Sequence, residues 1–153
     1  MDAQVARSMA KWPDVPAVYG WLELDRRGQW RIKGERIAHA GLREFIARNY
    51  QADERGRWFF QNGPQRVFVS LAYAPLVVHY EGERLLDQCG RPVVPRATYV
   101  DDEGSVLVAG GAAIALLDDR DLERYAELAE QLPTLQRSDL ERRFGFVREP
   151  RPA

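Results

Sequence analysis

RWFFQNGPQRVFVSLAYAPLVVHY, residues 57–80, is the densest run of β-branched and aromatic residues in the chain. Asn62-Gly63 interrupts this run, and Asn-Gly flanked by apolar residues is the strongest short-range signal for a β-hairpin. We therefore expect two antiparallel strands, at about 57–61 and 65–73, and a further strand after Pro75. The rest of the chain is expected to add strands to this sheet and helices that cover it.

A D-x-x-G tetrapeptide occurs four times in the chain, beginning at Asp25, Asp53, Asp87 and Asp101. Aspartate at the first position of a type I turn accepts hydrogen bonds from backbone N–H groups two residues further on, and glycine at the fourth position adopts positive φ cheaply. The repeats therefore predict four tight turns between strands. Calcium or magnesium loops are the alternative, but they require several more oxygen ligands at fixed offsets, which these tetrapeptides lack.

Further strands are expected at 18–25 and 30–34, and apolar periodicity predicts helices at 41–50, 119–132 and 138–144. Strands that follow one another with few helices between them are typical of α+β proteins. We predict an α+β fold with a mainly antiparallel sheet built from consecutive hairpins and two or three covering helices. One domain is expected over residues 1–147, followed by a disordered tail at 148–153, which is rich in proline and charge.

Length and charge restrict the possible functions. A chain of 153 residues suits one domain, and a net charge of −1 argues against a general nucleic-acid binder, whose affinity depends on excess lysine and arginine. The single cysteine, Cys89, is compatible with a reducing compartment. The N-terminus lacks the apolar region of a signal peptide, and no apolar run is long enough to span a bilayer. We expect a cytoplasmic protein that is not in a membrane.

No catalytic, metal or nucleotide motif stands out in the chain. His39, His79 and Cys89 lack the spacing of a zinc site, and no base is identifiable beside Cys89. Gly110-Gly111 follows an apolar strand but is not followed by the lysine of a phosphate loop. The acidic groups at 101–103 and 118–121 are explained by a turn and a helix N-terminus. We therefore predict no cofactor and no metal site, and the catalytic residues stay unknown.

The most suggestive composition is aromatic residues interleaved with arginine. The candidate binding residues are Trp21, Arg26, Arg27, Trp30, Arg31, Arg57, Trp58 and Arg66. Indole rings and guanidinium groups together stack on bases or hold acidic ligands. The alternative is that the tryptophans fill the core and the arginines face solvent. The alternation of Trp30 and Ile32 with Arg31 and Lys33 favours this alternative.

Residues 11–35, KWPDVPAVYGWLELDRRGQWRIKGE, and residues 57–69, RWFFQNGPQRVFV, resemble an uncharacterised family of small proteobacterial proteins, a domain of unknown function. The resemblance covers about the first half of the chain. It implies a bacterial, soluble, single-domain protein, and it carries over no activity and no site residues.

Three functional hypotheses remain open. The favoured one is a non-enzymatic binding or interaction domain that recognises a protein, a peptide or a small ligand. The second is an enzyme of unrecognised family with a carboxylate, arginine and histidine site. The third, which the charge balance disfavours, is a nucleic-acid-binding module that uses the Trp/Arg-rich hairpin. The protein is expected to be a monomer or a homodimer formed through an edge strand.

Overall fold

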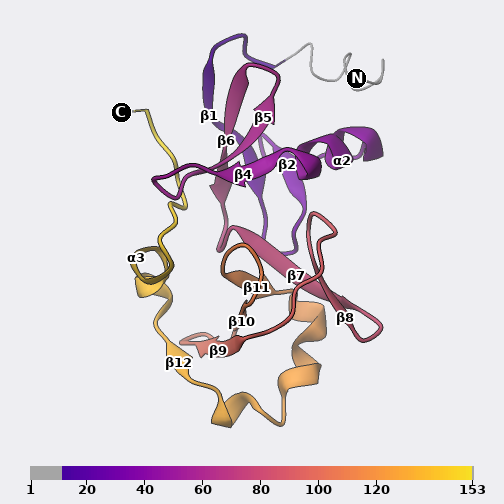
Figure 1. Ribbon diagram of the computed structural model, residues 1–153, viewed down its shortest axis with the longest axis vertical. Helices are drawn as coiled ribbons and strands as arrows, with labels where there is room; N and C mark the ends of the chain where they lie inside the picture. Colours follow the sequence, from indigo (N-terminus) through magenta and orange to yellow (C-terminus); the bar gives the residue numbers. More distant parts are fainter. Residues whose placement is uncertain (1–11, 153) are drawn as a thin grey trace.

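The computed structural model describes residues 12–152, and within them the chain forms two mixed sheets of six strands each. The first sheet is built from the N-terminal half of the chain and the second from the C-terminal half, and the two lie one after the other along the long axis of the molecule (Figure 1). Residues 1–11, from which sequence analysis infers the absence of a signal peptide, lie outside the described part.

The first sheet has the strand order β3-β2-β1-β6-β5-β4. Its strands are β1 (Ala17–Leu24), β2 (Trp30–Ile32), β3 (Glu35–Arg36), β4 (Tyr50–Ala52), β5 (Trp58–Asn62) and β6 (Gln65–Leu71). The hairpin predicted around Asn62-Gly63 is confirmed, because Asn62 pairs with Gln65 at the end of β5 and β6. Gly63, with φ +57°, and Pro64 form the two-residue loop, as in a type II′ turn.

The second sheet has the strand order β12-β9-β10-β11-β7-β8. Its strands are β7 (Leu76–Glu81), β8 (Arg84–Asp87), β9 (Ala97–Asp101), β10 (Val106–Ala109), β11 (Ala115–Leu117) and β12 (Thr134–Leu135). The strand expected after Pro75 is therefore β7, and it belongs to a different sheet from β5 and β6.

The predicted α+β class is confirmed at the coarse level, because strands dominate and few helices accompany them. The prediction of a sheet built from consecutive antiparallel hairpins needs correction. Strands β1 and β6 pair in parallel, as do β7 with β11 and β9 with β12. These parallel pairs join strands that are far apart in the sequence, so no turn motif marks them.

The first predicted helix is α2 (Ala40–Arg48), and the side chain of His39 caps it by accepting a hydrogen bond from the Leu42 N–H at 3.1 Å. The last is the short α3 (Leu140–Phe144), which ends at Gly145 in the left-handed region. The helix predicted over 119–132 is instead two short 3₁₀ segments, η1 (Asp119–Tyr125) and η2 (Ala129–Gln131), and η3 (Arg137–Asp139) precedes α3. Within residues 12–152, no helix is long and apolar enough to cross a membrane.

The four D-x-x-G turns are confirmed and share one geometry. In each, aspartate Oδ1 accepts hydrogen bonds of 2.8–3.0 Å from the backbone N–H groups two and four residues further on. The glycine N–H also donates to the aspartate carbonyl oxygen in every turn. The aspartates are thus structural acceptors, which is the role that the sequence predicts.

One cluster of buried apolar side chains spans both sheets, with Leu22 and Val69 from the first and Val78 and Leu107 from the second. The C-terminal segment returns from the second sheet to the first (Figure 1). Disorder from residue 148 onward stays a prediction. At the start of this segment, the Leu71 N–H donates to the carbonyl oxygen of Arg148 at 2.8 Å. Residue 153 lies outside the described part.

Candidate functional site

A pocket of about 760 Å³ lies between the two sheets, which we call the inter-sheet pocket. Helix α2 and strand β3 of the first sheet form one side, and the β7–β8 hairpin of the second sheet forms the other. Residues 28–30, where β2 begins, complete the lining. Pockets that hold small ligands measure roughly 300–1,000 Å³, so this one is large enough for a metabolite.

Three arginines line the first side and form what we call the arginine wall: Arg36, Arg43 and Arg48. Helical spacing explains two of them, because α2 buries Leu42 and Ile46 and turns residues 43, 44, 47 and 48 towards the pocket. Strand β3 contributes Arg36 from the edge of the first sheet.

The three guanidinium groups differ in their contacts. Arg43 Nη1 donates to the carbonyl oxygens of Ile37, at 3.2 Å, and Ala38, at 3.1 Å, so this side chain is held in place. The side chains of Arg36 and Arg48 are exposed and form no hydrogen bond or ion pair with residues 12–152. Glu44 lies one helical turn before Arg48, yet the two make no ion pair in that part of the chain. Two cationic groups are therefore available to a ligand.

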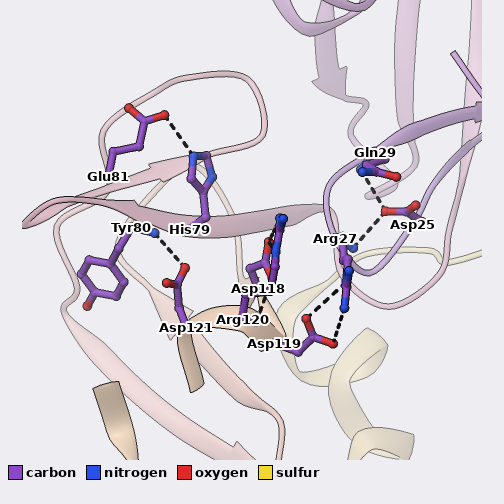
Figure 2. Close-up of polar contacts among 10 residues, drawn as sticks. All are labelled: Asp25, Arg27, Gln29, His79, Tyr80, Glu81, Asp118, Asp119, Arg120 and Asp121. Atoms are coloured by element: carbon purple, nitrogen blue, oxygen red, sulfur yellow. Dashed lines mark hydrogen bonds and ion pairs between the residues drawn. The ribbon is translucent and has the colours of Figure 1, made fainter. Parts of the chain in front are cut away.

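The opposite side, which we call the hairpin wall, carries His79, Glu81, Gln88 and Cys89. His79 and Glu81 point from the same face of β7, and His79 Nε2 lies 3.3 Å from Glu81 Oε1 (Figure 2). The side-chain amide of Gln88 is occupied, because its oxygen accepts from the Val77 N–H and its nitrogen donates to a carbonyl in the link between the sheets.

The thiol of Cys89 is not an activated nucleophile. Burial, together with the nearby carboxylate of Asp87, raises the pKa of Cys89 to about 12 despite the opposing effect of Arg91. A thiol with this pKa is protonated at neutral pH, and the thiolate is the reactive form.

Trp30 is the one predicted binding residue that lines the inter-sheet pocket. It is 3% exposed and packs edge-on against Tyr50, with ring centroids 4.9 Å apart. The Tyr50 hydroxyl donates to the carbonyl oxygen of Pro75 at 2.7 Å, and burial raises the pKa of this tyrosine well above its ordinary value. The floor of the pocket is therefore a fixed part of the core.

Arg26 and Arg27 lie at a second contact between the sheets. Arg26 donates to Ser105 Oγ at 3.2 Å, and its guanidinium lies 4.7 Å from the ring centroid of Tyr73. Arg27 forms an ion pair with Asp119 at 3.3 Å, which Figure 2 shows. Both side chains thus hold the two halves of the chain together.

The other predicted binding residues occupy separate places. Arg31 binds Asp25 at 2.9 Å, within one of the D-x-x-G turns. Trp58 is buried in the core, and Trp21 is half-buried with Lys33 lying over its ring at 4.7 Å. Trp21 Nε1 is buried without a hydrogen-bond partner in the described residues.

Arg57 and Arg66 cover aromatic rings elsewhere on the first sheet. Arg57 lies over Phe68 at 4.6 Å and Arg66 over Phe59 at 4.5 Å, and both rings are almost fully buried. The eight predicted residues are therefore not brought together into one face.

No motif in the sequence marks Arg36, Arg43, Arg48, Glu44 or His79 as site residues. Two of the arginines stand on the outer face of a predicted helix, where charged residues are ordinary. Only the packing of the second sheet against the first places His79 opposite them across the pocket, and no local spacing signals that arrangement.

The acidic residues that sequence analysis considered for cation binding have other partners. Asp118 caps η1 and binds Arg120, and Asp121 accepts from the Tyr80 N–H at 3.0 Å (Figure 2). Among residues 12–152, no group of three or more histidine, cysteine, aspartate or glutamate side chains is arranged to hold a metal ion.

Comparisons with known proteins place the chain in a family and a fold. The model of the DUF2944 family, described as "Protein of unknown function (DUF2946)", matches residues 1–151. No curated protein matches the chain.

Two solved structures are similar. A DUF1285 family protein from Silicibacter pomeroyi has a TM-score of 0.55 at 16% identity, over 84% of this chain and 85% of that one. A DUF1285 family protein from Shewanella baltica has a TM-score of 0.53 at 15% identity, over 69% of this chain and 90% of that one. They share the fold, and the expectation of an uncharacterised family is confirmed.

Proposed function

The chain belongs to the DUF2944 family, whose description assigns no activity, and we propose that it is a non-enzymatic binding domain. Its inter-sheet pocket takes a small anionic ligand, a carboxylate or a phosphate. The observation that carries the proposal is the arginine wall, in which Arg43 is fixed by carbonyl oxygens while Arg36 and Arg48 keep their guanidinium groups available.

Guanidinium groups suit this role because they are planar, always charged and present several N–H donors at once. Carboxylates and phosphates accept two parallel hydrogen bonds from one such group. A ligand held between Arg36 and Arg48 would replace water on two cations whose side chains are exposed in the described structure. Trp30, at the base of the same pocket, adds an apolar surface beside the charges.

Calorimetric titration tests this function with succinate and inorganic phosphate as probes. The double variant Arg36→Ala/Arg48→Ala is expected to bind roughly three- to thirtyfold more weakly, because each of the two exposed ion pairs contributes up to about 1 kcal/mol. Arg55→Ala is the matched control, since Arg55 is an exposed arginine outside the pocket. Equal binding by the wild type and the double variant would remove the proposal.

A second candidate, an enzyme, is favoured by one observation. His79 and Glu81 lie 3.3 Å apart on the side of the pocket opposite the arginines, so a bound anion would face two residue types that act as general acids and bases. Incubation with phosphate monoesters and carboxylic esters, followed by proton NMR, tests it. Turnover that is abolished by His79→Gln would favour an enzyme. If the substrates stay unchanged, the proposal of a non-enzymatic binding domain stands.

The aromatic residues give little support to a nucleic-acid-binding module. Base stacking needs exposed rings, but Trp30 and Trp58 are buried and Lys33 lies over Trp21. Titration with single-stranded RNA at two salt concentrations tests this function. Binding that weakens steeply with salt would revive it.

The cytoplasmic location and the oligomeric state complete the proposal. The single cysteine, Cys89, favours a location in a reducing compartment, and cell fractionation tests that location.

Homodimer formation through an edge strand would involve one of the strands that end the two sheets: β3, β4, β8 or β12. Sedimentation equilibrium separates that dimer from a monomer.

A further inference from the structure

We propose that the ligand of the inter-sheet pocket is a zwitterion, such as an amino acid, with its carboxylate at the arginine wall and its ammonium group at Glu81. This inference rests on the proposed function and adds the class of ligand. Its basis is that the two walls of one pocket carry unlike charges.

The positive charge is concentrated on the first sheet. Arg36, Arg43 and Arg48 all come from β3 and α2, and Arg36 and Arg48 have no ionic partner among residues 12–152. One carboxylate of a ligand has two oxygens for these two available guanidinium groups. Glu44, on the same helix, offsets part of its charge and so disfavours a second anionic group there.

The hairpin wall carries the opposite charge. Glu81 is its carboxylate, 62% of its side chain is exposed, and its one partner in the described residues is His79 at 3.3 Å. The His79 ring occupies one oxygen of Glu81, at 3.3 Å, and leaves the other lone pairs of the carboxylate to a ligand. The ammonium group of a ligand has three N–H donors that can bind these lone pairs.

A dianion fits this arrangement less well than a zwitterion. Its second acidic group would lie in a pocket that holds two carboxylates, Glu44 and Glu81, and like charges placed together oppose binding. A plain monocarboxylate would satisfy the arginine wall and leave Glu81 without a new partner. The affinity of the pocket should therefore depend on the group that each acid places at Glu81, and it should be highest for the acid with an ammonium group there.

Matched probes test that ranking by calorimetry at pH 7. The five-carbon set is pentanoate, 5-aminopentanoate and glutarate, which differ only in the group at the far end. The corresponding four- and six-carbon sets vary the spacing between the two ends. In the best-fitting set, the amino acid is expected to bind about three- to fivefold more tightly than the other two, the range of a partly exposed ion pair.

Two variants locate the preference. Glu81→Gln should remove the preference, so that 5-aminopentanoate and pentanoate bind with about equal affinity. The affinity for pentanoate itself should stay unchanged, because only the ammonium contact is lost. Glu83→Gln is the matched control, since Glu83 is exposed at the tip of the same hairpin and does not line the pocket. It should keep the wild-type ranking.

The possible results distinguish failure of the zwitterion proposal from failure of the proposed anion-binding function. If the dicarboxylate binds as tightly as the amino acid in every set, and Glu81→Gln has no effect, the zwitterion is overturned and anion binding stays intact. If no probe binds, or if binding survives Arg36→Ala/Arg48→Ala unchanged, the proposed function fails as well. The predicted ranking, lost in Glu81→Gln and kept in Glu83→Gln, supports both.

Discussion

The Tyr73 hydroxyl donates a hydrogen bond to Asp101 Oδ2 and so ties the link between the two sheets to the β9–β10 turn. Both residues are buried, and Asp101 Oδ1 already accepts the two backbone N–H groups of its own turn. Burial raises the pKa of Tyr73, and the bond to Asp101 raises it further. The contact joins segments 28 residues apart.

Tyr73→Phe removes this hydroxyl and leaves a buried carboxylate oxygen without its partner. The expected loss is about 1–3 kcal/mol in the free energy of unfolding, measured by urea denaturation. Tyr99→Phe is the control, because the Tyr99 hydroxyl forms no hydrogen bond with residues 12–152, and its effect should stay within roughly 0.5 kcal/mol. Equal losses in the two variants would show that the Tyr73 hydroxyl does not stabilise the fold.

Two glycines of the D-x-x-G turns differ in their surroundings. Gly56 and Gly104 have φ of +78° and +87°, but a Cβ on Gly56 would lie 2.1 Å from the carbonyl oxygen of Gly145, whereas one on Gly104 would meet nothing within 4 Å. Gly104→Ala should cost about 1–2 kcal/mol from backbone strain alone. Gly56→Ala should cost more, because the returning C-terminal segment must also move. Thermal denaturation of both variants compares them, and a cost for Gly56→Ala no larger than for Gly104→Ala would contradict that packing.

Acid should destabilise the protein through Asp53 and Asp118. Burial favours the protonated form of Asp53, but hydrogen bonds from Arg57 and Arg55 outweigh it and hold the pKa of Asp53 below its ordinary value. Arg120 lowers the pKa of Asp118 against burial in the same way. A carboxyl group with a lowered folded-state pKa stabilises the protein above its unfolded pKa of about 4, and this contribution is lost as pH falls through the folded value.

Chemical denaturation between neutral pH and about pH 2 measures that loss. Asp118→Asn should be less stable than the wild type at neutral pH and should lose less stability on acidification, because one carboxyl group with a lowered pKa is gone. Parallel pH profiles for the wild type and the variant would contradict the role of Asp118.

Cys89 should react slowly with thiol reagents. Because burial and Asp87 raise its pKa to about 12, little thiolate exists below pH 9. We expect modification by an aromatic disulfide to be much slower in the folded protein than in urea at the same pH. Equal rates in the two states would mean that the thiol is not buried and that its ionisation is not suppressed in the folded protein.

The turn chemistry could be predicted from sequence because it is local. Each D-x-x-G motif contains both the acceptor and the glycine that its turn needs, and all four form. The apolar spacing over 119–132 predicts one α-helix, yet the segment forms the two 3₁₀ segments η1 and η2, and Asp121 in η1 accepts a hydrogen bond from the Tyr80 N–H in β7. A tertiary contact of that kind leaves no mark in the local pattern.

The candidate site could be predicted only in part. The interleaving of aromatic residues with arginine predicts Trp30 as a binding residue, and it does line the inter-sheet pocket. Arg36 and Arg48, however, resemble any exposed arginine until the fold is known. Their importance comes from their position opposite His79 and Glu81, which lie on a different sheet. The parallel pairing and the packing of two sheets create that position, and both depend on long-range contacts.

An amide NMR map of 5-aminopentanoate binding tests the central claim most directly. If the inter-sheet pocket is the ligand site, the shifted signals should cluster at residues 28–30, 43–48, 79–81 and 88–89, and the Trp30 indole signal should move with them. The same shifts should disappear in Arg36→Ala/Arg48→Ala and persist in Arg55→Ala. Shifts that cluster elsewhere, or that the double variant retains, would contradict the assignment of this pocket as the ligand site.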